Sequence, residues 1–91
     1  MPEPAVVAED VQRVLKQVIR PGDPDEGEAV GRVAGRAGVS TRTVYRVLNL
    51  GEDASMSLDL ADRLVLAAGR QLAEINCRIV VDGRVVEYGD A

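Results

Sequence analysis

Four arginines, and no acidic residue, lie between residues 31 and 49 of this 91-residue chain. They are Arg32, Arg36, Arg42 and Arg46, and a guanidinium group can form forked hydrogen bonds with phosphate oxygens or with the edge of a base. Residues 1–30 carry seven acids and three bases, and residues 50–91 carry eight acids and four bases. The formal net charge of −4 is therefore the sum of −4, +4 and −4 along the chain. Such a segregated charge can present one positive face to an anionic partner.

Catalysis and metal binding have few residues to draw on. The chain contains no His and one Cys, so most zinc sites and most nucleophile–base pairs cannot be assembled. The acid clusters that carboxylate catalysis or Mg²⁺ binding would need occupy ordinary positions, either at a predicted helix start (Asp59 and Asp62) or in a polar loop (Asp23, Asp25 and Glu26). We therefore expect no enzyme activity, no metal and no cofactor. Cys77 is interpreted as a small buried apolar residue rather than a reactive thiol.

The elements that must hold the arginines are predicted to be helices, because apolar residues recur at spacings of three and four. The predicted helices cover residues 4–20, 28–37, 41–49 and 57–69, with one further helical turn at 70–75. The first helix should bury Val7, Val11, Val14, Leu15, Val18 and Ile19, and expose Glu9, Asp10, Gln12, Arg13 and Lys16. Loops are expected at 21–27 and 50–57, where Pro, Gly and polar residues gather.

The end of the chain changes to a different pattern. Two runs rich in β-branched residues, 78–81 and 84–88, are separated by Asp82-Gly83, which is a strong signal for a tight β-hairpin. Consecutive valines make both faces of this ribbon apolar. The predicted fold is a mainly α single domain over residues 1–91, a compact bundle of four to five helices with a C-terminal β-hairpin at 77–88.

Residues 33–49, VAGRAGVSTRTVYRVLN, are the most informative segment. Two helices joined by a short turn at Gly38, with the small Ala34 at their contact, follow the helix-turn-helix plan, in which the second helix enters the major groove of DNA. Ser40 should cap that helix, and Thr41, Arg42, Tyr45 and Arg46 should face outward. Each forked contact between Arg and guanine discriminates by about 1–3 kcal/mol.

Several side chains of this segment have a second interpretation. Tyr45 either contacts phosphate or base, or packs as a half-buried ring against its neighbours. Arg32 and Arg36 either reach the DNA backbone or are solvated, with Glu28 as a possible partner for Arg32. Gly31 and Gly35 either lower the helix propensity without further consequence, or allow a second helix to approach closely.

The motif resembles the DNA-binding headpiece of lac-repressor-type regulators, through Val33-Ala34, Ala37-Gly38-Val39-Ser40, Thr43-Val44, Arg46-Val47 and Asn49. This resemblance implies that Thr41, Arg42 and Arg46 face bases, and that Ser40 and Thr43 cap the helix or touch phosphate. The downstream run SLDLADRLVLAAGRQLAEI is more similar to the last helices of small phage-repressor domains of the lambda type. No segment resembles a hinge helix or a sugar-binding domain, so we expect no small-molecule effector.

We therefore expect a sequence-specific regulator of transcription that binds double-stranded DNA, of phage or prophage type and cytoplasmic, without a membrane span or a signal peptide. The predicted DNA contacts are Arg32, Arg36, Ser40, Thr41, Arg42, Thr43, Tyr45, Arg46 and Asn49. A homodimer on a palindromic operator is expected to pair through Ile79, Val80, Val81, Val85, Val86 and Tyr88, with the long first helix at residues 4–20 as the second candidate surface. The alternatives are a protein-interaction module, such as an antirepressor or antitoxin-like adaptor, and an excisionase-type architectural protein.

Overall fold

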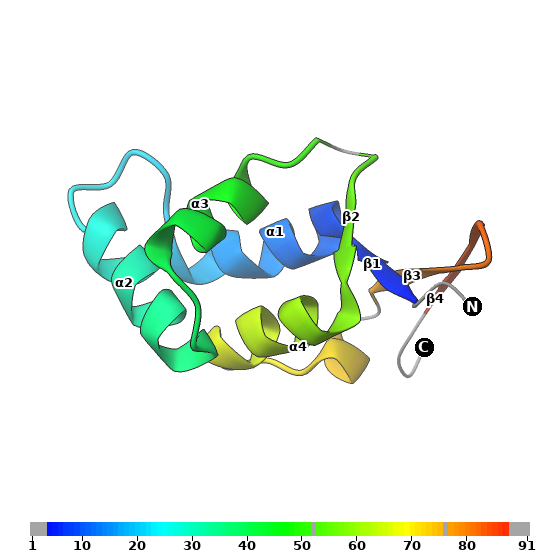
Figure 1. The fold of residues 1–91 in the computed structure, drawn as a ribbon. Coiled ribbons are helices and arrows are strands. Elements are labelled where there is room, and N and C mark those ends of the chain that lie inside the picture. Colours follow the sequence, from blue (N-terminus) through cyan, green and yellow to red (C-terminus); the bar gives the residue numbers. More distant parts are fainter. Residues whose placement is uncertain (1–3, 52, 76, 88–91) are drawn as a thin grey trace.

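The computed structural model describes residues 4–51, 53–75 and 77–87, which form a helical layer with a small sheet at one end (Figure 1). The elements in chain order are β1 (Ala5–Val7), α1 (Ala8–Val18), α2 (Glu26–Ala37), α3 (Thr41–Leu48), β2 (Ser55–Ser57), α4 (Leu58–Ala67), a 3-10 turn (Leu72–Glu74), β3 (Arg78–Val81) and β4 (Arg84–Glu87). The prediction of a largely helical fold with a C-terminal hairpin is confirmed at this level. Two further strands, β1 and β2, were not predicted.

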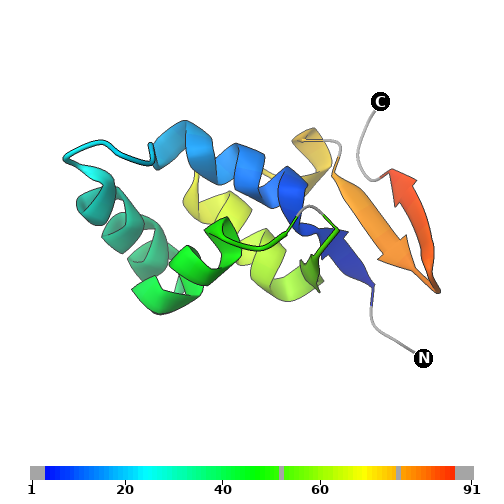
Figure 2. The same cartoon turned by 90° about the horizontal axis from the view of Figure 1, so that it is seen from above.

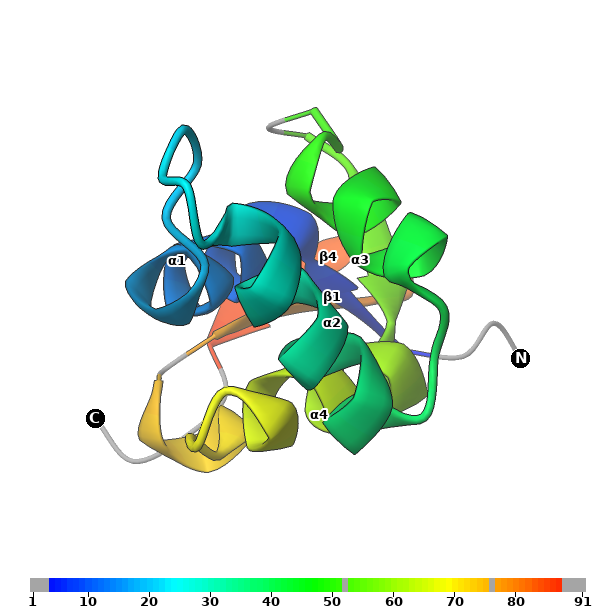
Figure 3. The same cartoon turned by 90° about the vertical axis from the view of Figure 1, so that its left-hand side faces the viewer.

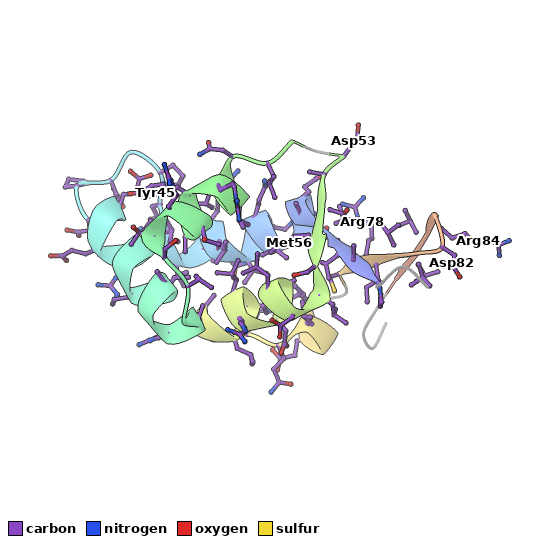
Figure 4. The ribbon with its side chains drawn as sticks, in the orientation of Figure 1. Tyr45, Asp53, Met56, Arg78, Asp82 and Arg84 are labelled. Atoms are coloured by element: carbon purple, nitrogen blue, oxygen red, sulfur yellow. The ribbon has the colours of Figure 1, made fainter. Side chains whose placement is uncertain are left out.

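The four strands form one antiparallel sheet in the order β2-β1-β3-β4. Val6 of β1 is the centre of this arrangement, because it faces Met56 of β2 on one side and Ile79 of β3 on the other. All three side chains are buried, and Figure 4 shows Met56 directed from β2 into the helical layer. The sheet therefore closes one end of the helical core, and the hairpin is its outer half rather than an isolated ribbon.

Two predicted boundaries were wrong because each hides a short strand whose pairing partner is remote. Residues 5–7 are a strand and not the first turn of α1, and residues 55–57 are a strand within the expected loop. Each has only three residues, and its pairing partner lies far along the chain. Such short strands carry no periodicity that a sequence reading could detect. The second helix also begins at Glu26, two residues earlier than expected.

The core matches most of the predicted helix faces, but Val7 of β1 is only half-buried and three side chains of α1 differ from the prediction. Val11, Val14, Leu15 and Ile19 are buried as expected, but Val18 is 42% exposed. Asp10 and Gln12, which were assigned to the outer face, are only 5% and 8% exposed. Both are buried because remote segments, β3 and the end of α3, lie over the polar side of α1. Their hydrogen bonds compensate the cost of burial.

The hairpin extends beyond the helices, as the view from above shows (Figure 2). Its two-residue turn has positive φ at Asp82 (52°) and Gly83 (76°), as the Asp-Gly signal predicted. Asp82 and Arg84 lie at its far tip in Figure 4. Cys77, at the base of β3, is fully buried as expected, and burial together with the nearby Asp10 charge raises the pKa of its thiol.

Gly31 and Gly35 lie on the exposed side of α2. A Cβ atom added at either position would meet nothing within 4 Å, so no second helix of this chain approaches them within the described residues. Gly38, in contrast, has φ +72°, a left-handed conformation that ends α2.

Replacing both Gly31 and Gly35 with alanine is expected to raise the free energy of unfolding by about 1–2 kcal/mol in total, because alanine restricts the unfolded backbone and favours a helix. The matched substitution Gly38→Ala should instead lower it by about 1 kcal/mol, because a Cβ atom is unfavourable at positive φ. Urea unfolding of the three proteins measures both changes. A loss of stability in Gly31→Ala/Gly35→Ala would show that this face is packed against a second molecule.

Candidate nucleic-acid interface

The local structure of the segment from α2 to α3 follows from short-range preferences of its residues. Ala29, Val30, Val33, Ala34 and Ala37 are all buried along one side of α2. At its end, the backbone N–H groups of Gly38 and Val39 both donate to the carbonyl oxygen of Ala34. This closed turn leaves only residues 38–40 between the two helices, so α3 must pack close to α2.

Helix α3 begins with the cap that the sequence predicted. The Ser40 Oγ accepts a hydrogen bond from the backbone N–H of Thr43 at 3.2 Å and lies 3.0 Å from the Thr43 Oγ1. This cap orients the first turn, where the remaining N–H groups carry the positive end of the helix dipole. Val44 and Val47 are 0% and 2% exposed, and they seat the helix against α1 and α2.

The opposite side of α3 is a solvent-facing surface, which we term the α3 face. It consists of Thr41, Arg42, Tyr45, Arg46 and Asn49. These residues are exposed and, at spacings of one, three and four, they project from the same side of the helix. Tyr45 is 39% exposed and is labelled on α3 in Figure 4. The side-chain amide of Asn49 turns back and donates to the Tyr45 carbonyl oxygen at 2.8 Å, so this residue also caps the end of α3.

The other two arginines of the cationic segment do not join the α3 face. Arg32 and Arg36 are exposed on α2, where they border a groove with Val18 of α1, Ala67 of α4 and Ala68, which follows α4. The four arginines of residues 31–49 therefore form two pairs on different surfaces. Arg42 and Arg46 lie on α3, and Arg32 and Arg36 lie on a surface to which no described residue of α3 contributes.

All four arginines differ from most other bases of the chain in their pairing. Arg13, Arg63, Arg70 and Arg78 each form a salt bridge with an acid. Over residues 4–51, 53–75 and 77–87, none of the four arginines at positions 32–46 has an acid within salt-bridge distance, and Glu28 does not pair with Arg32. Their charge is therefore available to an external anion.

Gln12, which was predicted to be exposed to solvent, holds α3 in place. The Gln12 Nε2 donates to two carbonyl oxygens at the C-terminal end of α3, that of Val47 at 2.9 Å and that of Leu50 at 2.7 Å. The Val47 carbonyl also accepts the backbone N–H of Leu50 at 3.2 Å, so Gln12 adds a second donor there and supplies a donor to Leu50 just beyond the helix end. No sequence signal marks Gln12, because a glutamine among polar residues reads as a solvated position.

A second buried polar side chain, Asp10, anchors the sheet to α1. Its carboxylate accepts hydrogen bonds from the Arg78 backbone N–H at 2.7 Å and from the Arg78 guanidinium at 3.2 and 3.0 Å. Burial acts to raise the pKa of Asp10, but the side-chain and backbone hydrogen bonds from Arg78 and its positive charge lower the pKa below the ordinary value of 3.8. The same pairing raises the pKa of Arg78.

The dimer surface expected on the hairpin needs one correction. Ile79 is 6% exposed and belongs to the core, and Val80 is half-buried, so neither presents a free apolar surface. Val81, Val85 and Val86 are 40%, 60% and 47% exposed. Tyr88 lies outside the described residues.

The described part of the chain holds no cluster of three or more potential metal ligands. None of its helices combines the length and the hydropathy that crossing a bilayer requires. Comparison with protein-family models, with curated proteins and with solved structures found no match to this chain.

Proposed function

We propose that this protein binds double-stranded DNA in a sequence-specific manner, with α2, the turn at Gly38 and α3 acting as a helix-turn-helix and the α3 face entering the major groove. The observation that supports this most is the α3 face itself. It presents two arginines that pair with no acid of the described residues, on a helix whose reverse side is fixed by Val44 and Val47. A rigid cationic helix of this kind matches the width of the major groove.

Within this proposal the residues have separate roles. Arg42 and Arg46 donate forked hydrogen bonds to base edges, most favourably to O6 and N7 of guanine. The hydroxyl of Thr41 and the N-terminal N–H groups of α3 hold a phosphate and set the position of the helix along the groove. The chain would act by occupancy, as a transcription regulator of the phage or prophage type that blocks a competing protein at its operator.

The acidic remainder of the chain also has a role in this proposal. Residues 1–30 and 50–91 each carry a charge of −4, which repels phosphate away from the α3 face. Binding to DNA in other orientations is thereby weakened. Sequence preference then depends on the two arginines of α3 more than on net charge.

We also propose that two copies bind together. A helix of eight residues contacts few base pairs, and a two-fold dimer places two such helices about 34 Å apart on a palindromic site. The edge strand β4, with Val85 and Val86 exposed, is the surface on which a second copy is expected to pair.

The test is a salt series on DNA selected by the protein from a random duplex pool. For the wild type, the logarithm of the association constant should fall linearly with the logarithm of the salt concentration. Arg42→Ala/Arg46→Ala should weaken binding to the selected duplex by more than about thirtyfold, because it removes two contacts of about 1–3 kcal/mol each. The stoichiometry of the complex reports whether two copies bind.

Lys16→Ala/Arg20→Ala is the matched control. It removes the same charge from exposed positions near the end of α1, and should lower affinity by a small factor that is equal for selected and scrambled duplexes. Absence of any enriched sequence, or equal losses in the two double variants, would contradict the proposal and favour a protein-interaction module.

A further inference from the structure

Arg32 and Arg36 border a groove at the end of the molecule opposite the sheet. Figure 3 looks onto this end, where α2 lies in front with α1 and α4 beside it. The groove has a volume of about 240 Å³, and five apolar residues from the three helices line it: Val18, Ala29, Val33, Ala67 and Ala68. Val18 is 42% exposed there, although its neighbours along α1 are buried or polar.

The two arginines are four residues apart on α2 and therefore lie one above the other on the same side of the helix. Like charges at this spacing repel each other by a few tenths of a kcal/mol unless an anion lies between them. Within the part of the chain that the structure describes, no acid pairs with either of them. The groove thus has space for one apolar side chain, beside two guanidinium groups that pair with no acid of the described residues.

We propose that this groove binds an acidic amphipathic peptide segment of a protein partner. One large apolar side chain of the peptide occupies the space over Ala29, Val33 and Ala67, and carboxylates on either side of it pair with Arg32 and Arg36. Arginine suits this task because its planar group binds a carboxylate through two parallel hydrogen bonds.

The charge of the adjoining surface determines which way the bound peptide lies in the groove. The hollow next to the groove shares Val18, Ala29 and Arg32 with it, and also contains Arg20, Asp23, Asp25 and Glu26. Acids of the peptide would be repelled there. The preferred segment therefore ends its acidic run at Arg32 and carries neutral or basic residues beyond it, toward the loop at 23–26.

A peptide fits the groove better than the DNA backbone does. A phosphodiester has no large apolar group to occupy the space between α1, α2 and α4, and its contacts with arginine do not need an apolar floor. The groove is also lined without any residue of α3, so the two functions can operate on separate surfaces of one chain. This inference does not depend on the proposed DNA binding.

The probes are three blocked pentapeptides. The first has a central phenylalanine with two glutamates on each side. The second has lysines in place of the glutamates, and the third has a central alanine in place of the phenylalanine. Titration is followed by the amide NMR signals of Ala29, Val33, Ala67 and Ala68. Only the glutamate–phenylalanine peptide should give saturable shifts, and Arg32→Ala/Arg36→Ala should weaken its binding at least tenfold. Equal shifts with all three peptides, or no shifts, would overturn the proposal.

The double variants of α2 and α3 separate this inference from the proposed function. Arg32→Ala/Arg36→Ala should lose the peptide and keep the salt dependence of DNA binding, whereas Arg42→Ala/Arg46→Ala should keep the peptide. If Arg32→Ala/Arg36→Ala instead reduced the slope of the salt dependence by nearly two, these arginines would be phosphate contacts and the peptide proposal would fail. Both pairs are exposed, so neither variant removes a core contact.

Discussion

Asp10→Ala is expected to lower the free energy of unfolding by about 2–4 kcal/mol at neutral pH. The Asp10 carboxylate is 5% exposed and accepts three hydrogen bonds from one residue of β3. Hydrogen bonds to a charged group contribute about 1.5–3 kcal/mol each before coupling, and removal of one partner leaves the backbone N–H of β3 without an acceptor. Urea unfolding at pH 7 measures the loss.

The pH dependence of this effect has a definite sign. Because the pKa of Asp10 in the folded protein lies below the unfolded value of 3.8, the folded state favours the ionised form. The stabilisation is therefore complete above about pH 5, and it is lost as the pH falls below 3.8 through the folded pKa. The difference between wild type and Asp10→Ala should be constant from pH 5 to 7 and shrink in more acidic solution.

Asp59→Ala is the matched control for this substitution. Asp59 also pairs with an arginine, at 3.2 Å, but its side chain is 80% exposed. Exposed pairs contribute little, so the loss should be about 1 kcal/mol or less. Equal losses at positions 10 and 59 would mean that the buried carboxylate does not anchor the sheet.

Gln12→Leu is the second substitution with a large expected effect, about 1–3 kcal/mol of unfolding free energy. It retains the apolar bulk of the side chain but leaves the Leu50 carbonyl without its donor and the Val47 carbonyl with the Leu50 N–H alone, and an unsatisfied buried acceptor costs about 1–3 kcal/mol. Amide exchange at residues 48–51 should accelerate more than exchange in α4, because the end of α3 is the part that is released.

The matched control for Gln12→Leu is on the same helix. Gln17 is exposed and accepts one hydrogen bond from Arg70 at 3.2 Å, so Gln17→Leu should change stability by no more than about 0.5 kcal/mol. Gln12→Glu adds a test by pH, since an ionised carboxylate would face two carbonyl oxygens. That variant should be less stable than Gln12→Leu at pH 7 and should recover as the carboxylate becomes protonated in acid. A Gln12→Leu protein as stable as the wild type would show that solvent replaces the donor.

Gln12 also connects stability with the proposed DNA binding. In that proposal, the two arginines of α3 can discriminate between bases only if the helix axis is held in one orientation, and Gln12 holds the C-terminal end of the helix. We therefore expect Gln12→Leu to reduce the preference for the selected duplex by more than it reduces binding to a scrambled one.

The parts of this fold that follow from local chemistry were predicted correctly. Ser40 caps α3, Gly38 ends α2 with positive φ, and Asp82-Gly83 makes the two-residue turn of the hairpin. Each of these depends on the conformational preference of one or two residues and their immediate neighbours. The buried faces of α2 and α3, and the exposed residues of the α3 face, follow equally from the spacing of valine and alanine within single helices.

The predictions that were wrong concern features that depend on contacts between segments far apart in the sequence. Residues 5–7 become a strand because residues 55–57 and 78–81 lie on either side, and Asp10 and Gln12 are buried by β3 and by the end of α3. The cationic segment at 31–49 is evident in the sequence, but its division into the α3 face and the α2 groove is not. Side chains ten residues apart share a surface only when their helices pack in the right orientation, and burial in the common core sets that orientation.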